Sequence, residues 1–291
     1  MPLFQPPLPP LPSSLSFSGK TIVITGASAG LGLAAAQILV LRGAREVIFA
    51  VRSTQKGEAA KTRILSMPEV KTANPKAIIT VMHLDLEDYS SVLNFSGDIK
   101  TKYPTLDMLL LNAGFGSLQF ELTTTGHEKM IQVNLLSSAL LTLELLPLLE
   151  KASSVKGTPS RLTWVGSFVQ SQHSLTSRPV SPSSGMLGHF SSPSSFIPGT
   201  RYPDSKFLGT LFVRRLAKSV DRKKVVVNEV SPGMVKTGFG DYPLWMRAMF
   251  GVILFVRARS PVEGAGTYAH ALGVVGGESH GKYLSDGKIS T

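Results

Sequence analysis

Six short runs of apolar and β-branched residues recur along the chain, and longer helical patterns separate them. The predicted strands are TIVIT (21–25), EVIFAV (46–51), AIITVM (77–82), DMLLL (107–111), RLTWVG (161–166) and VVVNEV (225–230). Continuous apolar runs of this length are typical of strands that are buried on both faces. Strands that alternate with helices through right-handed crossovers form a parallel sheet with helices on both sides. The pattern therefore predicts a single doubly wound α/β domain.

The predicted helices lie between these runs, and the longest of them are strongly apolar. They cover LGLAAAQILVLRG (31–43) and about residues 54–67, 90–102, 124–149 and 202–220. We find no internal repeat and no composition shift in the middle of the chain. One domain over residues 18–291 follows from this pattern.

Three segments depart from the alternation. Residues 1–17 are rich in proline, which predicts an extended, poorly ordered arm. Residues 170–200 are rich in serine and proline, and a loop of this length is usually an active-site cover or a disordered insertion. The apolar stretch within 240–260 is either a helix of a substrate pocket or core, or a helix that rests on a membrane surface.

Composition limits the classes of function. The formal charge of +11 favours an anionic partner such as a phosphorylated cofactor, or serves only solubility. The basic residues are scattered, so we expect no nucleic-acid binding. The absence of cysteine excludes disulfides and thiolate catalysis, and no histidines or carboxylates have metal-ligand spacing, so we expect no metal. The N-terminus does not resemble a secretory signal and no uninterrupted apolar run reaches spanning length, so we expect a soluble, cytoplasmic protein.

A run of small residues follows the first predicted strand and opens the first predicted helix. It reads TGASAGLG at 25–32. Small residues at such a turn let the backbone approach a pyrophosphate, whose charge is then held by the helix N-terminus. A position between a strand and a helix is the context that dinucleotide binding requires. We therefore predict a dinucleotide-binding (Rossmann) fold with cofactor contacts from Gly26, Ser28, Gly30, Leu31 and Gly32.

The end of the second predicted strand bears on the choice of dinucleotide. An acidic side chain there would bind the adenosine ribose of NAD, but the strand ends FAVRS, with Arg52 at that position. A guanidinium suits a 2′-phosphate, which a carboxylate would repel. Arg52, with Ser53 beside it, therefore favours NADP(H). The alternative is that Arg52 is a solvated loop residue.

Tyr202 and Lys206 stand four positions apart in RYPDSK (201–206). Four residues slightly exceed one helical turn, so the two side chains share a face if a helix begins here, and Pro203 is tolerated in a first turn. Free tyrosine titrates near pH ~10, and a neighbouring ammonium favours its phenolate form. The pair suits acid–base catalysis, although Tyr-x-x-x-Lys also occurs by chance in many helices.

Further motifs accompany this pair and the glycine-rich turn, in a fixed order. They are Asp85-Leu86 after the third strand, Asn112-Ala113-Gly114 after the fourth, Asn134 in the long helix, Ser167 after the fifth strand, and Pro232-Gly233 with Val235 and Thr237 after the sixth. The ordered set resembles the short-chain dehydrogenase/reductase superfamily, in its compact single-domain form, over about residues 18–285.

The resemblance implies a catalytic role for Ser167, Tyr202, Lys206 and Asn134. Tyr202 would be the general acid/base, and Lys206 would tune it and bond the nicotinamide ribose. Ser167 would bond the substrate carbonyl oxygen, and Asn134 would hold a water that connects Lys206 to solvent.

The resemblance also implies further cofactor contacts. Asp85 and Leu86 would lie near the adenine, and Asn112, Ala113 and Gly114 beside the cofactor. Pro232, Gly233, Val235 and Thr237 would hold the nicotinamide end.

Two features depart from the usual pattern of the family. The separation of Ser167 from Tyr202 is much longer than usual, which together with VRS at 51–53 resembles the retinol-dehydrogenase-like branch that is abundant in fungal secondary metabolism. The chain also ends soon after KYLSDG, where relatives of that branch often continue through another helix. It is either a short member of the family or one whose C-terminus has been removed.

The function implied is an NADP(H)-dependent oxidoreductase that interconverts a ketone and a secondary alcohol on a bulky, largely apolar small molecule. By family analogy it would form a homodimer or homotetramer through the helices at 124–150 and 202–219. Two alternatives remain: the same fold with non-redox chemistry such as cyclisation or isomerisation, and a non-catalytic NADP(H)-binding regulator.

Overall fold

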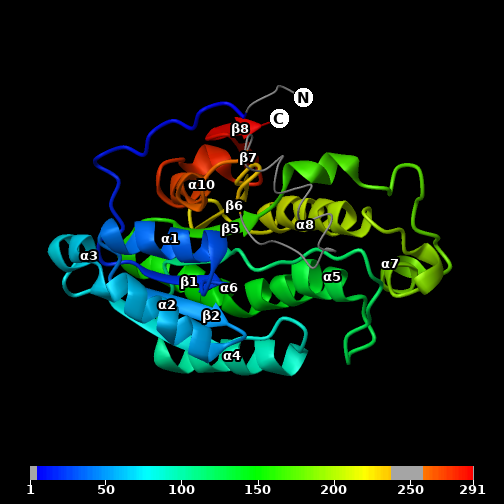
Figure 1. Ribbon diagram of the computed structural model, residues 1–291, viewed down its shortest axis with the longest axis horizontal. Coiled ribbons are helices and arrows are strands. Elements are labelled where there is room, and N and C mark those ends of the chain that lie inside the picture. Colours follow the sequence, from blue (N-terminus) through cyan, green and yellow to red (C-terminus); the bar gives the residue numbers. More distant parts are fainter. Residues whose placement is uncertain (1–4, 237–257, 291) are drawn as a thin grey trace.

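A computed structural model of the protein describes residues 5–236 and 258–290. They form a single eight-stranded sheet in the order β3-β2-β1-β4-β5-β6-β7-β8 (Figure 1). The strands are β1 (Thr21–Thr25), β2 (Glu46–Val51), β3 (Ile78–His83), β4 (Met108–Leu111), β5 (Ser160–Val165), β6 (Val225–Ser231), β7 (Tyr283–Ser285) and β8 (Lys288–Ser290). All neighbouring pairs are parallel except β7 with β8. The predicted doubly wound α/β fold is confirmed.

Helices cover both faces of this sheet and create two separate cores. One core gathers buried side chains from α1 (Gly30–Leu41), α2 (Thr54–Ser66), α3 (Pro68–Ala73) and α10 (Pro261–Gly273). The other gathers those from α4 (Tyr89–Lys102), α6 (Ser137–Lys156) and α8 (Arg201–Ala217). Because the strands carry apolar side chains on both faces, each face needs its own layer of helices.

The long apolar helix predicted from the sequence is continuous, but its first part includes a π-helical turn. It consists of α5 (Lys129–Ile131), a π-helical turn (Gln132–Leu136) and α6, and so begins several residues later than predicted. By length and composition Lys129–Lys156 could cross a membrane, but 61% of its most apolar stretch is buried inside the fold. Its composition is that of a helix packed on a sheet.

The proline-rich arm packs against the domain from Gln5 onward, which differs from the poor order expected of it. The Gln5 side-chain amide donates to the Met234 carbonyl at 2.8 Å and accepts from the Met234 N–H at 2.7 Å. Arg259 donates to the Pro6 carbonyl at 2.7 Å. Leu15 and Phe17 are buried in the core that α1 and α10 share. These contacts tie the arm to the loop that follows β6.

Helix α8 sits close to the sheet because Gly209 faces the indole of Trp164 on β5. A Cβ atom at position 209 would lie 2.8 Å from Trp164 Nε1. Tyr202 and Lys206 are carried by the first two turns of α8. The absence of a side chain at position 209 therefore sets how closely these two residues approach the end of β5.

We expect Gly209→Ala to lower the free energy of unfolding by about 1–3 kcal/mol, because the new methyl group overpacks the α8–β5 contact. Urea unfolding measures the change. The matched control is Gly97→Ala on α4, where the added Cβ meets nothing within 4 Å. That variant should be neutral or up to about 1 kcal/mol more stable, because alanine is the better helix former. Equal effects of the two substitutions would contradict the close seating of α8.

Candidate active site

The predicted site residues come together at one edge of the sheet, because they follow the carboxyl ends of parallel strands. The segments after β1, β2, β3, β4, β5 and β6 all begin at this edge. In open α/β sheets this edge forms the crevice in which ligands bind.

The glycine-rich turn after β1 is compact enough to exclude side chains. Gly26 and Gly30 adopt positive φ angles of 70° and 56°, which favour glycine. A Cβ atom on Gly32 would lie 2.4 Å from the Gly26 carbonyl oxygen. Helix α1 then begins with no side-chain cap and no acidic residue in its first turn. The backbone and the positive end of the helix dipole are thus presented to a ligand, and Ser28 is half-buried within the turn.

Residues after β4 hold this turn in place. The Asn112 side chain donates to the Thr25 carbonyl at 2.9 Å, and the Ala113 N–H donates to the Thr25 hydroxyl at 2.9 Å. Gly114 lies between two other predicted site residues. A Cβ atom there would be 3.0 Å from Asn134 Oδ1 and 3.4 Å from Lys206 Nζ.

The loop after β6 meets the start of α1. A Cβ atom on Gly264 of α10 would lie 2.7 Å from a Val235 methyl carbon and 2.8 Å from a Leu31 methyl carbon, so these two residues converge. Gly233 has a φ of 76°, and the Pro232 carbonyl accepts from Arg259 at 3.2 Å. Thr237 and most of the 240–260 segment lie outside the described residues.

Asn134 lies in the π-helical turn and its amide is fully engaged. Its Oδ1 accepts from the Phe115 N–H at 2.9 Å, and its Nδ2 donates to the Phe115 carbonyl and to Ser205 Oγ, both at 3.0 Å. Single π-helical turns inside α-helices often mark functional sites. Ser205 Oγ donates in turn to the Tyr202 carbonyl at 2.8 Å. Asn134 is thereby connected to the first turn of α8.

Tyr202 and Lys206 lie on one face of α8, as their spacing predicts. Tyr202 is half-buried, and the Lys206 ammonium lies 5.7 Å from the centre of the Tyr202 ring. Lys206 Nζ donates to the Val165 carbonyl at the end of β5, at 2.9 Å. Ser167 follows two residues later and is half-buried. Its hydroxyl accepts from the Val169 N–H at 3.4 Å and begins a short 3₁₀ turn (Phe168–Gln172).

Lys206 is only 4% exposed. Burial lowers its pKa to about 8, although the carboxylate of Glu229 acts in the opposite direction. A lysine whose pKa lies this close to neutrality can change its charge within the working range of an enzyme.

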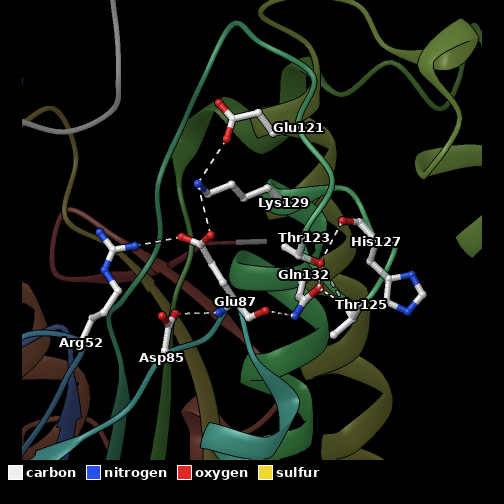
Figure 2. A network of polar contacts seen from close by, with 9 residues as sticks. All are labelled: Arg52, Asp85, Glu87, Glu121, Thr123, Thr125, His127, Lys129 and Gln132. Carbon is white, nitrogen blue, oxygen red and sulfur yellow. Dashed lines mark hydrogen bonds and ion pairs between the residues drawn. The ribbon is translucent and has the colours of Figure 1, made fainter.

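Arg52 belongs to a chain of ion pairs beside the predicted adenine end of the site (Figure 2). Its guanidinium lies 2.8 Å from the Glu87 carboxylate, and its side chain is 69% exposed. Lys129 lies 3.2 Å from both Glu87 and Glu121. The Asp85 carboxylate accepts from the Glu87 N–H at 2.9 Å, which orders the backbone after β3. Arg52 is therefore solvated, but a carboxylate holds it in place.

The neighbours of Arg52 and Asp85 in sequence have structural contacts. Ser53 caps α2 by accepting from the Lys56 N–H at 3.3 Å. Leu86 is buried, and its carbonyl accepts from the Ser137 hydroxyl at 2.6 Å. That bond joins the segment after β3 to α6.

The long segment before α8 is built around Arg201, the residue that precedes Tyr202. The segment contains α7 (Gly185–Phe190) and a second 3₁₀ turn (Pro193–Ser195). The Arg201 guanidinium is fully buried, donates to the Phe190 carbonyl at 3.2 Å, and lies 4.7 Å from the ring centre of Phe190. Asp204 accepts from the N–H and the hydroxyl of Ser174 at 2.6 and 2.9 Å. Both ends of the segment are thus attached to the first turn of α8.

Sequence reasoning missed four residues that shape the site: Ser205, Arg201, Glu87 and Glu229. The only sequence signal for three of them is that they stand next to or near motif residues in the chain: Arg201, Ser205 and Glu87. Glu229 had a clearer one, because it is a charged residue inside the apolar run VVVNEV. A charge in a strand that is buried on both faces needs a specific partner.

We expect Arg201→Met to lower the free energy of unfolding by about 3–5 kcal/mol, because it leaves Glu128 buried without the opposite charge that it now faces. Limited proteolysis should then cut within residues 170–200. The control is Arg178→Met, an exposed arginine in the same segment, which should leave both readouts unchanged. Equal resistance of the two variants to protease would contradict the role of Arg201 as an anchor.

The chain matches known proteins in both sequence and structure. The family model described as short chain dehydrogenase matches residues 20–159. The short chain dehydrogenase macD of Penicillium terrestre is 42% identical over 99% of this chain and 88% of its own length. The short chain dehydrogenase yanD of Aspergillus niger is 43% identical, with the same coverage.

Solved structures share the fold at lower identity. The RhlG/NADP active-site complex of Pseudomonas aeruginosa is 22% identical, with a TM-score of 0.66, over 93% of this chain and 96% of that one. A short chain dehydrogenase from Shigella flexneri complexed with NADP is 22% identical, with a TM-score of 0.68, over 94% and 98%. Because two relatives above 40% identity align with nearly all of it, this chain belongs to the short-chain dehydrogenase/reductase family of oxidoreductases.

Proposed function

We propose that the protein is an NADP(H)-dependent oxidoreductase that interconverts a ketone and a secondary alcohol on a bulky, largely apolar small molecule. The observation that carries the proposal is the pair on α8: a buried ammonium, Lys206, held one helical turn from the half-buried phenol of Tyr202. An ammonium at this place favours the phenolate, which suits Tyr202 to give and take a proton.

The residues around the glycine-rich turn fit a dinucleotide. The turn leaves no room for side chains at Gly32, and α1 begins without a side-chain cap. Its backbone N–H groups and helix dipole suit a pyrophosphate. Leu31 and Val235 converge where the nicotinamide end would lie, and Asp85 with Leu86 would face the adenine. The two NADP complexes among the similar structures also favour a nicotinamide cofactor.

Each catalytic candidate has a distinct part in the proposed mechanism. When bound, the nicotinamide supplies or accepts the hydride. Tyr202 protonates the carbonyl oxygen during reduction and removes the hydroxyl proton during oxidation. Ser167 donates a hydrogen bond to the same oxygen, where negative charge develops. Asn134, through Ser205, fixes the backbone of Tyr202, and by family analogy it would hold a water that connects Lys206 to solvent.

The substrate class is inferred from the segments that border the site. Residues 170–200 bring the half-buried Phe196 close to the first turn of α8, with its ring centre 5.4 Å from the Arg201 guanidinium. The apolar stretch within 240–260 follows the Val235 loop in sequence. Both favour a substrate with a large apolar surface, such as those of natural-product biosynthesis.

The outer faces of α6 and α8 favour association of two or four copies. Leu143 on α6 and Leu211 on α8 are large apolar side chains that remain exposed, at 53% and 43%. An exposed apolar side chain on each of these two helices is compatible with a symmetric interface between copies. We therefore propose that the protein forms a homodimer or homotetramer. We also propose that it acts in the cytoplasm.

Loss of the Tyr202 hydroxyl tests the chemistry directly. With NADPH and a panel of bulky ketones and quinones, Tyr202→Phe should reduce kcat by about 10²- to 10⁴-fold and leave the affinity for NADPH nearly unchanged, because only proton transfer is lost. The measurement is the absorbance decrease of NADPH, with NADH as the comparison. Turnover that survives the substitution would contradict Tyr202 as the acid. Tight NADPH binding without turnover in either protein would favour a non-redox activity or a regulatory role.

Cofactor preference should depend on Arg52 and Glu87. Arg52→Ala removes a charge-assisted hydrogen bond to the 2′-phosphate, so the Kd for NADPH should rise by about 10- to 100-fold while that for NADH changes little. Glu87→Gln should have the opposite effect on NADPH, because it frees Arg52 from its carboxylate. Fluorescence titration measures both. The control is Arg63→Ala, an exposed arginine in the last turn of α2. An equal loss of both cofactors in Arg52→Ala would overturn this role.

A further inference from the structure

A buried carboxylate lies next to the pair on α8, and the mechanism above does not use it. Glu229 is the only charged residue of β6 and is 1% exposed. It is paired in register with Trp164 on β5 and with Tyr283 on β7, so it lies inside the sheet. A carboxylate in such a place needs hydrogen bonds and an opposite charge to remain there.

The local packing places this carboxylate and the Lys206 ammonium beside successive residues of β5 and the turn after it. Lys206 Nζ donates to the carbonyl of Val165. The next residue is Gly166, and a Cβ atom there would lie only 2.0 Å from Glu229 Oε1, so the carboxylate occupies the space of the missing side chain. Thr210, one helical turn after Lys206 on α8, donates its hydroxyl to Glu229 Oε1 at 2.9 Å.

We propose that Glu229 is a positioning residue of the active site that acts through Lys206: its buried carboxylate keeps the ammonium charged and held at the Val165 carbonyl. The consequence for catalysis rests on the proposed function, in which Lys206 must carry a positive charge to favour the Tyr202 phenolate. The attraction between the two groups does not depend on that function.

The pH range of this effect follows from the two titrations. Burial raises the pKa of Glu229 to about 7, against the hydrogen bond from Thr210 and the positive charges of Lys206 and Arg214. Burial lowers the pKa of Lys206 to about 8. Tyr283 on β7, whose pKa burial raises to about 12, stays neutral in this range. Below pH 7 Glu229 becomes neutral, whereas Lys206 keeps its proton without help. Above pH 7 the carboxylate is charged and delays the loss of the Lys206 proton, which with Glu229 present occurs as the pH rises through 8 and without it would occur at a lower pH.

Glu229→Gln tests the proposal because glutamine resembles the protonated acid. The ratio of wild-type to variant kcat should be close to one at pH 6 and should rise to about tenfold by pH 8.5, since a loss of one pKa unit in Lys206 is a tenfold change in its charged fraction. The KM for the ketone should stay the same. Glu229→Asp, which keeps a carboxylate, should restore part of the activity at pH 8.5. A decrease that is the same at every pH would overturn the proposal.

The matched control is Glu46→Gln on β2. Glu46 is another buried strand glutamate, and its carboxylate accepts the hydroxyls of Thr80 and Tyr103, both at 2.7 Å. It lies at the amino end of its strand, away from Lys206. The ratio of wild-type kcat to that of Glu46→Gln should not change with pH.

A second readout requires neither cofactor nor substrate. In urea unfolding, a double-mutant cycle of Glu229→Gln and Lys206→Met should give a stabilising coupling at pH 8 that shrinks at pH 6. Absence of coupling at pH 8 would overturn the proposal even if the enzyme is active. Coupling in a protein that turns over no ketone would support the interaction and count against the proposed function alone.

Discussion

The cost of burying the Lys206 ammonium governs the arrangement of the site. A charge that is 4% exposed must find its partners within the protein, and here these are the Val165 carbonyl and the carboxylate of Glu229. Both partners belong to the centre of the sheet, where the backbone is most constrained. The flexible four-carbon side chain of lysine is thereby held in one position. Tyr202 lies one turn earlier on α8, so the helix fixes its place relative to Lys206.

Close approach of backbones makes this arrangement possible, and glycine provides it at three points. Gly209 lets α8 lie against Trp164, Gly166 leaves room for the Glu229 carboxylate, and Gly114 lies against both Asn134 and Lys206. In each case a single methyl group would occupy space that a functional or packing side chain already fills. The polar centre of the site thus depends on steric gaps in the segments around it.

The order of the elements was predictable from the sequence, because apolar runs and glycine-rich turns report on short-range periodicity. The doubly wound fold and the family are confirmed, whereas β7, β8 and α10 were not predicted; the two strands have only 3 residues each, too few to show a pattern. The motif residues converge at one sheet edge, but their catalytic and cofactor roles stay predictions. Glu229 and Arg201 were not assigned a role, because the partners of a buried charge are distant in the sequence: Glu229 meets Thr210 and Arg201 faces Glu128. Arg52 was singled out as a candidate for the 2′-phosphate, with a solvated loop residue as the alternative, and that role stays a prediction; its link to Glu87 depends on the crossover geometry.

The clasp between Gln5 and Met234 ties the earliest described part of the chain to a loop that borders the site. Two hydrogen bonds to one backbone unit imitate the pairing of a β-strand, and Arg259 adds a third attachment at Pro6. Changes to the amino-terminal arm can therefore affect the loop beside the site. A fusion partner or affinity tag joined to the arm would act on the backbone beside Val235, and the β7–β8 hairpin meets the same arm, because a Cβ atom on Gly287 would lie 2.7 Å from Pro9.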